Sequence, residues 1–177
     1  NFAINYVDKT YECSTSDQLF YVLSHGYRPL PVSGSIAYRI YGKFKEIMRA
    51  VCDDRMTDLQ KARAIFDWLV INVYYDNNVA YTTLPQASYK YNAFYLEGVL
   101  NGSAVCDGLS KAYSVMCAIE GIDCIRVTGK LKDAEEGDAG HAWNKIQLMG
   151  EWFLSDSTWG NRVVGVKNEA DVNYYEY

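Results

Sequence analysis

Histidine is scarce in this 177-residue sequence, and its cysteines lack the spacing of a structural metal site. A catalytic zinc site of the common histidine-rich type needs several imidazoles, and the chain offers only His25 and His141. None of its cysteines forms the C-x2-C pair of a zinc knuckle. The sequence therefore predicts neither a bound metal nor a cofactor, and it predicts a structural or exposed role for His25.

The sequence also shows no basic cluster, no long apolar run and no signal-like segment. A net charge of −5 without a basic patch argues against nucleic acid as a partner. No apolar run approaches the ~18 residues that a membrane span needs. The chain begins at Asn1, which we interpret as a processed or trimmed form that has lost any targeting sequence. We expect a protein or peptide substrate, no nucleic-acid partner and no membrane span.

What the chain does have is enough apolar material for one domain, at 49% hydrophobic residues, and an odd number of cysteines. At least one of the five thiols must stay unpaired within the chain. Two of them, Cys117 and Cys124, are typical of buried thiols, and a Cys13–Cys52 disulfide stays open as a possibility in an exported protein. A reactive free thiol is the most economical use of the remaining cysteine, Cys106.

Helical periodicity is clear in the first half of the chain. Apolar residues recur at helical spacing over residues 35–52, and a second helix over 57–74 begins with the capping box Thr57-x-x-Gln60. The regions around these helices are read as an irregular N-terminal extension with a strand or short helix (1–34), a long surface loop (76–92) and a short helix (92–100) ending at Asn101-Gly102.

The second half predicts one helix followed by an antiparallel meander. The helix begins at Cys106 and ends before Gly121, and strands follow at 124–128, 141–148 and 152–156, the last two joined by a turn at Met149-Gly150. Helices followed by antiparallel strands define an α+β fold. We expect an N-terminal extension (1–56) packed on a catalytic core (57–177), together forming a single compact domain.

Three residues of this half have the chemistry of a thiol enzyme. Cys106 at a helix N-terminus would be stabilised as thiolate, and its N–H would form half of an oxyanion hole. With the turn at 149–150, position i pairs with 299 − i, so His141 and Asp156 lie one diagonal step apart on one face. The alternatives are an inert core thiol, a structural strand histidine, and an aspartate that caps the turn at Ser157 and Thr158.

The segments KARAIFDWLVINVYYD (61–76), AVCDGLSKAYSVMCAIEGIDCIRVTG (104–129) and GHAWNKIQLMGEWFLSDSTWG (140–160) resemble the transglutaminase-like superfamily of bacterial type. The resemblance implies a papain-like core in which a helix carrying Cys106 packs on an antiparallel sheet carrying His141 and Asp156. It also implies a second oxyanion donor upstream of the cysteine, for which Tyr75 is the candidate beside its reading as a core or rim tyrosine. Trp143 and Trp159 lie in the same motifs and are expected to line the site, where shielding of the His–Asp pair is favoured over substrate contact.

Three functions follow from this reading. The leading one is a cysteine peptidase or amidase that works through a Cys-His-Asp triad and an acyl-enzyme. The second is a transglutaminase that links glutamine to amines, and the third is a catalytically silent binding module of a surface protein. The acidic segment 133–138 beside the histidine motif favours water over amines as the acyl acceptor and is at most a weak cation site. The resemblance implies export or a cell-surface location, as is common for bacterial relatives.

Overall fold

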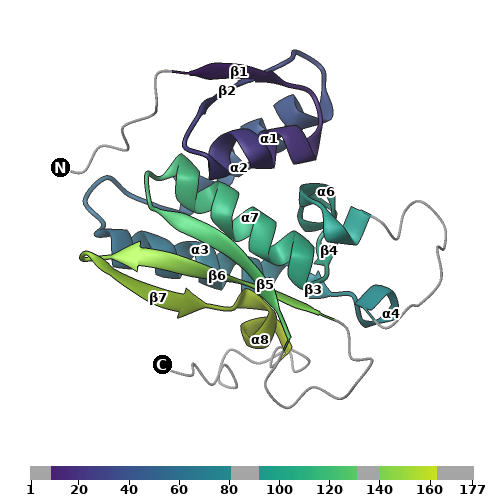
Figure 1. Cartoon of the computed structure of the whole chain (residues 1–177), viewed down its shortest axis with the longest axis vertical. Helices are drawn as coiled ribbons and strands as arrows, with labels where there is room; N and C mark the ends of the chain where they lie inside the picture. The colour runs from purple at the N-terminus through teal and green to yellow at the C-terminus, as the bar shows by residue number, and fades with distance from the viewer. Residues whose placement is uncertain (1–8, 81–91, 131–139, 163–177) are drawn as a thin grey trace.

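The structure is a computed structural model that describes residues 9–80, 92–130 and 140–162 (Figure 1). Its first elements are β1 (Thr10–Cys13), α1 (Ser16–Ser24) and β2 (Arg28–Pro31), with β1 and β2 paired in parallel. α1 begins with a reciprocal capping box between Thr15 and Gln18. The described part of residues 1–34 is therefore a regular β-α-β unit, where the sequence predicted an irregular segment with a strand or short helix.

The next two helices are those that the sequence predicts. α2 (Ile36–Val51) is capped by the side chain of Ser35, and α3 (Asp58–Asn72) by the capping box of Thr57 and Gln60. Their apolar faces are buried against one another and against the remaining helices, as the helical periodicity requires.

Short elements fill the middle of the chain. They are β3 (Tyr74–Tyr75), α4 (Asn77–Ala80), η1 (Asn92–Phe94), α6 (Leu96–Leu100) and β4 (Ser103–Ala104). The helix predicted over 92–100 is present as η1 and α6, whereas most of the loop predicted over 76–92 lies outside the described residues. β3 and β4 pair in parallel, which the sequence did not predict, and this pairing sets Tyr75 beside Ala104.

The last elements are α7 (Cys106–Ile119), β5 (Cys124–Gly129), β6 (His141–Leu148), β7 (Glu151–Ser155) and α8 (Ser157–Arg162). The three strands form an antiparallel sheet in the order β5-β6-β7. Met149 and Gly150 both have positive φ, at 53° and 85°, as a two-residue hairpin turn of this kind requires. The register runs from Leu148↔Glu151 to Asn144↔Ser155, so the predicted pairing rule is confirmed within the hairpin.

The prediction for this hairpin is wrong at its open end. β7 stops at Ser155, so Asp156 leaves the ladder instead of pairing with Trp143, and Thr158 does not pair with His141. The physical reason is α8, which begins at Ser157 and turns the chain away from the sheet. The sequence analysis did not predict this helix.

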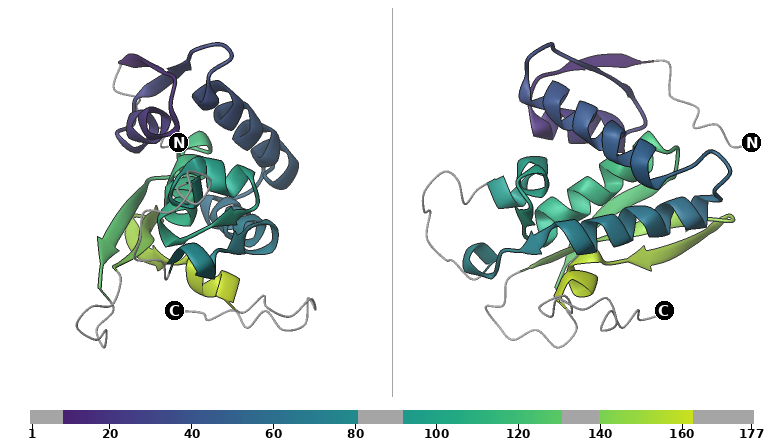
Figure 2. Two further views of the ribbon diagram at one scale, coloured as in Figure 1. Left: turned by 90° about the vertical axis from the view of Figure 1, so that its right-hand side faces the viewer. Right: turned by 180° about the vertical axis from the view of Figure 1, so that it is seen from behind.

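α7 lies at the centre of the molecule. It contacts the sheet through β5 and β6 on one side and α1, α2 and α3 on the others (Figure 2). Its buried residues, among them Leu109 and Met116, belong to one core cluster with Phe44, Leu69 and Ile146. The α+β fold is thus confirmed, while a division of the chain at residue 56 stays a prediction. No described helix is both long and apolar enough to cross a membrane.

Candidate active site

Cys106 is the first residue of α7, as the sequence predicts. The N-cap residue is Val105, whose apolar side chain makes no capping hydrogen bond to the N–H groups of the first turn. These N–H groups and the helix dipole favour negative charge on a thiol placed there. Gly108 lets this turn pack tightly, because a Cβ at that position would lie 2.4 Å from the carbonyl oxygen of Ala93.

His141 and Asp156 are joined by a short hydrogen bond. His141 Nε2 lies 2.6 Å from Asp156 Oδ2, and both side chains are largely buried. The other carboxylate oxygen, Oδ1, accepts a hydrogen bond of 3.0 Å from the N–H of Thr158. Asp156 therefore contacts the histidine and also caps the first turn of α8, so the two interpretations of this residue are compatible.

The pKa of the Cys106 thiol links it to the same group. Burial raises this pKa, but the His141 side chain, the backbone N–H of Ala142 and the charge of the imidazolium together lower it by more, so the thiol pKa lies below its ordinary value. The Asp156 hydrogen bond and then the Cys106 hydrogen bond raise the pKa of His141 to about 9. Both directions favour a thiolate–imidazolium pair.

Trp143 packs beside this pair. Its ring stacks on the His141 imidazole with the centroids 5.7 Å apart, and its far edge fills the space where a Cβ of Gly129 would lie. This contact restricts the orientation of the imidazole. Trp159 lies on α8 and is 46% exposed. Its role as a site-lining residue stays a prediction.

Tyr75 is buried at 7% exposure in the core cluster. It pairs with Ala104, which precedes Cys106 by two residues. Its position is compatible with either reading of the sequence, a core tyrosine or a second oxyanion donor. The oxyanion role stays a prediction.

The remaining four cysteines are free thiols, and Cys13 forms no disulfide with Cys52. Cys117 is buried as the sequence predicts, whereas Cys124 is only half-buried. Burial raises the pKa of Cys117 well above its ordinary value. Burial is also the main cause that raises the pKa of Cys52 to about 11. None of these environments favours a thiolate as the start of α7 does.

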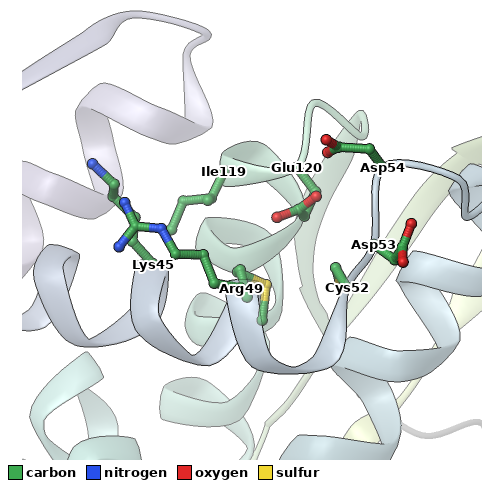
Figure 3. Close-up of a pocket in the computed structure, with 8 residues that line it drawn as sticks. Lys45, Arg49, Cys52, Asp53, Asp54, Ile119 and Glu120 are labelled. Atoms are coloured by element: carbon green, nitrogen blue, oxygen red, sulfur yellow. The ribbon is translucent and has the colours of Figure 1, made fainter.

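A cavity of about 180 Å³ lies near the opposite end of α7 (Figure 3). Its lining comprises Lys45, Met48, Arg49, Cys52, Asp53, Asp54, Ile119 and Glu120. Because α7 rises 1.5 Å per residue, Ile119 lies roughly 20 Å from Cys106. This cavity is therefore separate from the Cys106–His141–Asp156 group.

Sequence reasoning missed the polar groups that hold the site together. Asn144, in the same motif as His141, is 1% exposed, and its Nδ2 donates to Ser110 O at 3.0 Å and to Ser114 Oγ at 2.9 Å. Asp107, directly after the thiol, pairs with Arg126 on β5. An amide and a carboxylate inside otherwise apolar motifs were the available signals.

Within residues 9–80, 92–130 and 140–162, no three His, Cys, Asp or Glu side chains are grouped to hold a metal ion. The weak cation candidate at 133–138 lies outside the described residues.

Comparison with known proteins identifies the family of the chain. Residues 45–157 match the Transglutaminase-like superfamily, so the chain belongs to that family. The match begins inside α2. The earlier resemblance to this superfamily is thereby confirmed.

The sequence relatives are animal proteins. The chain is 31% identical to mouse kyphoscoliosis peptidase and 32% identical to the human protein, in each case over an alignment of 127 positions that covers 67% of this chain. It is 24% identical to Hillarin of Drosophila melanogaster over an alignment of 148 positions that covers 77% of this chain. The chain spans only 17–18% of the length of these relatives.

A crystal structure of a TGase is similar in fold, with a TM-score of 0.56 and 20% sequence identity. The similarity covers 77% of this chain and 34% of that one. At this identity the likeness supports the fold alone.

Proposed function

We propose that this chain is a thiol-dependent amide-bond hydrolase, a cysteine peptidase or amidase that acts through an acyl-enzyme on Cys106. The observation that carries the proposal is the His141–Asp156 hydrogen bond beside a thiol at the N-terminus of α7, whose pKa the His141 side chain lowers. Nucleophile, base and orienting group within hydrogen-bond reach are the arrangement that covalent acyl transfer needs. The name of the mouse and human relatives, kyphoscoliosis peptidase, agrees with the proposal.

The geometry assigns a role to each imidazole nitrogen. Because Nε2 is held by Asp156, Nδ1 is the nitrogen left to exchange a proton with the thiol in this proposal. The thiolate attacks the amide carbonyl carbon, and the C–N bond breaks as His141 gives its proton to the leaving nitrogen. Water then attacks the thioester, His141 takes a proton from it, and the C–S bond breaks to release the acid and restore Cys106.

The developing oxyanion needs hydrogen-bond donors that are already in place. The N–H of Cys106 at the start of α7 is one donor in this proposal. The hydroxyl of Tyr75 is the proposed second donor. Its buried strand adjoins Ala104, two residues before the nucleophile.

The alternative acyl acceptor is a primary amine, which would make the chain a transglutaminase. Water is favoured in this proposal because the segment 133–138, which precedes the histidine motif in the sequence, is acidic. Negative charge near the site would raise the pKa of an approaching lysine, whereas attack requires the neutral amine. The discriminating experiment incubates the chain with a glutamine-containing protein mixture and a biotinylated primary amine. Hydrolysis gives new termini or deamidated glutamines without biotin, and Cys106-dependent incorporation of biotin would establish transfer instead.

The direct test of the enzyme proposal uses a thiol-directed probe that mimics an amide substrate. Intact-mass analysis should show one adduct, and peptide mapping should locate it on Cys106. Cys106→Ala should abolish the adduct, and the matched variant Cys52→Ala should leave it unchanged. Absence of labelling at Cys106 would favour a catalytically silent binding module. A bacterial source and export to the cell surface stay predictions.

A further inference from the structure

Two cations surround the carboxylate of Asp107, the residue directly after the proposed nucleophile. Arg126 Nη2 donates to Asp107 Oδ1, and Lys111 Nζ lies 3.0 Å from Asp107 Oδ2. The three side chains are only 13–23% exposed, so solvent and salt screen their charges less than those of surface pairs.

The cations reach Asp107 from different layers of the fold. Lys111 lies one turn further along α7, and its Nζ also donates to Phe94 O at 3.0 Å and lies 4.7 Å above the Tyr95 ring. Arg126 comes from β5, where it pairs across the sheet with Asn144 of β6. The Asp107–Arg126 pair therefore ties the first turn of α7 to the sheet that carries His141. Figure 1 shows α7 beside β5 of this sheet.

A bare carboxylate at position 107 would oppose the proposed chemistry. The helix dipole stabilises a negative charge in the first turn, such as that of Asp107. The same charge, adjacent to Cys106, disfavours a second negative charge on the thiol and raises its pKa. A cation held against Asp107 removes this conflict, because it keeps the aspartate in place and cancels its field at Cys106.

The surroundings of Arg126 do not satisfy every hydrogen-bond donor of its guanidinium. Its Nε is buried and has no acceptor within the part of the chain that the structure describes. A buried donor without a partner costs stability. This observation favours a role for the guanidinium beyond packing.

We propose that Arg126, assisted by Lys111, is a positioning residue that neutralises Asp107 and holds the start of α7 against the sheet, so that Cys106 stays a thiolate beside His141. This inference rests on the proposed function, because it concerns the same thiol. It adds a charge-compensating pair to the group formed by Cys106, His141 and Asp156.

The test removes the two charges one at a time and together, and measures the pKa of the Cys106 thiol in each variant. This pKa is obtained from the pH dependence of the alkylation rate of Cys106, followed by mass spectrometry. R126Q leaves Asp107 uncompensated and should raise the thiol pKa by roughly one pH unit. D107N leaves the cations uncompensated and should lower it. The double variant D107N/R126Q removes both charges and should return the thiol pKa close to that of the unaltered chain.

Opposite shifts in the two single variants are the signature of charge compensation, since a purely structural role would disturb the thiol in the same direction in both. R126K keeps the charge and should retain most of the low thiol pKa even if R126Q folds poorly. R49Q, near the far end of α7, is the matched control and should change nothing.

The two proposals can fail separately. An unchanged thiol pKa in R126Q, or a raised one in D107N, would overturn this inference while leaving a reactive Cys106. An ordinary thiol pKa in the unaltered chain would overturn the proposed function and, with it, this inference.

Discussion

At the scale of single residues, the five thiols have very different surroundings. Cys106 starts a helix and contacts an imidazole, and its pKa is lowered by those contacts. Burial raises the pKa of Cys13, Cys52 and Cys117. Since the thiolate is the reactive form, these environments determine which cysteine is alkylated first.

We therefore expect limited iodoacetamide treatment near neutral pH to modify Cys106 before any other cysteine. Peptide mapping after short exposures gives the order of labelling. Denatured protein provides the control, because unfolding should make the five rates similar. Earlier labelling of any other cysteine would contradict the assignment of the nucleophile.

The pH dependence of kcat/KM follows from the pKa values of Cys106 and His141. Activity should rise with pH as the thiol of Cys106 ionises, and because its pKa is lowered, this rise should occur below the pKa of an ordinary cysteine. It should fall near pH 9, as the imidazolium that protonates the leaving nitrogen loses its proton. A pH series with an amide or ester substrate measures both limbs, and an alkaline limb that stays flat beyond pH 10 would argue against the His141 role.

Asp156→Asn tests the orienting residue. The amide oxygen can still accept the Thr158 N–H, so the fold should persist, whereas the correct imidazole tautomer is no longer selected. We expect turnover to fall by several orders of magnitude, about 10⁴ by the precedent of serine enzymes. The alkaline limb should also move to lower pH, because the main cause of the raised His141 pKa is gone.

The control for this variant is Asp67→Asn on α3, where the aspartate is 33% exposed and pairs with Arg63 of the same helix. It should keep full activity. An Asp156→Asn enzyme with unchanged kcat would remove Asp156 from the triad.

At the scale of elements, the start of α7 depends on a close approach to η1. Gly108 faces the carbonyl of Ala93, and that backbone cannot move away as a flexible side chain could. Two glycines within helices offer a matched comparison, because a Cβ on Gly42 of α2 would meet nothing within 4 Å.

Gly108→Ala should therefore destabilise the protein by roughly 1–3 kcal/mol through overpacking and should slow alkylation of Cys106. Gly42→Ala should be neutral or stabilising by up to about 1 kcal/mol, since alanine favours a helix interior. Urea unfolding and timed alkylation measure the two effects. Equal stability of the two variants would show that α7 tolerates a shift away from η1.

At the scale of the whole molecule, the site depends on how the helix α7 packs against the sheet β5-β6-β7. Cys106 belongs to the helical layer and His141 to the sheet, and Asn144 links the two through Ser110 and Ser114. A buried amide that bonds both a backbone carbonyl and a hydroxyl fixes how the sheet sits on α7.

Asn144→Ala should cost about 1–3 kcal/mol of unfolding free energy, because it leaves buried Ser110 O without this donor and opens a small cavity. It should also lower the alkylation rate of Cys106, since His141 lies on the same strand. Lys145→Ala, at the neighbouring exposed position, is the control and should do neither. A loss of stability without any change in alkylation would show that the thiol keeps its partner by other contacts.

Local physics explains what the sequence alone determined. Capping at Thr57, the left-handed turn at Met149-Gly150 and the start of α7 at Cys106 each depend on neighbouring residues, so they were predictable. The register of the hairpin follows from the turn, and the motifs that carry His141 and Asp156 indicated the family.

Only the tertiary structure decided the rest, because those features join residues that are distant in the sequence. The departure of Asp156 from the sheet depends on α8. The pairing of Tyr75 with Ala104 depends on how the short strands β3 and β4 meet. The contact between Asp107 and Arg126 spans 19 residues and exists only where α7 packs on β5. Hydrophobic periodicity and secondary-structure propensity depend only on nearby residues and do not describe such contacts. The charge compensation beside the thiol was therefore visible only in the three-dimensional structure.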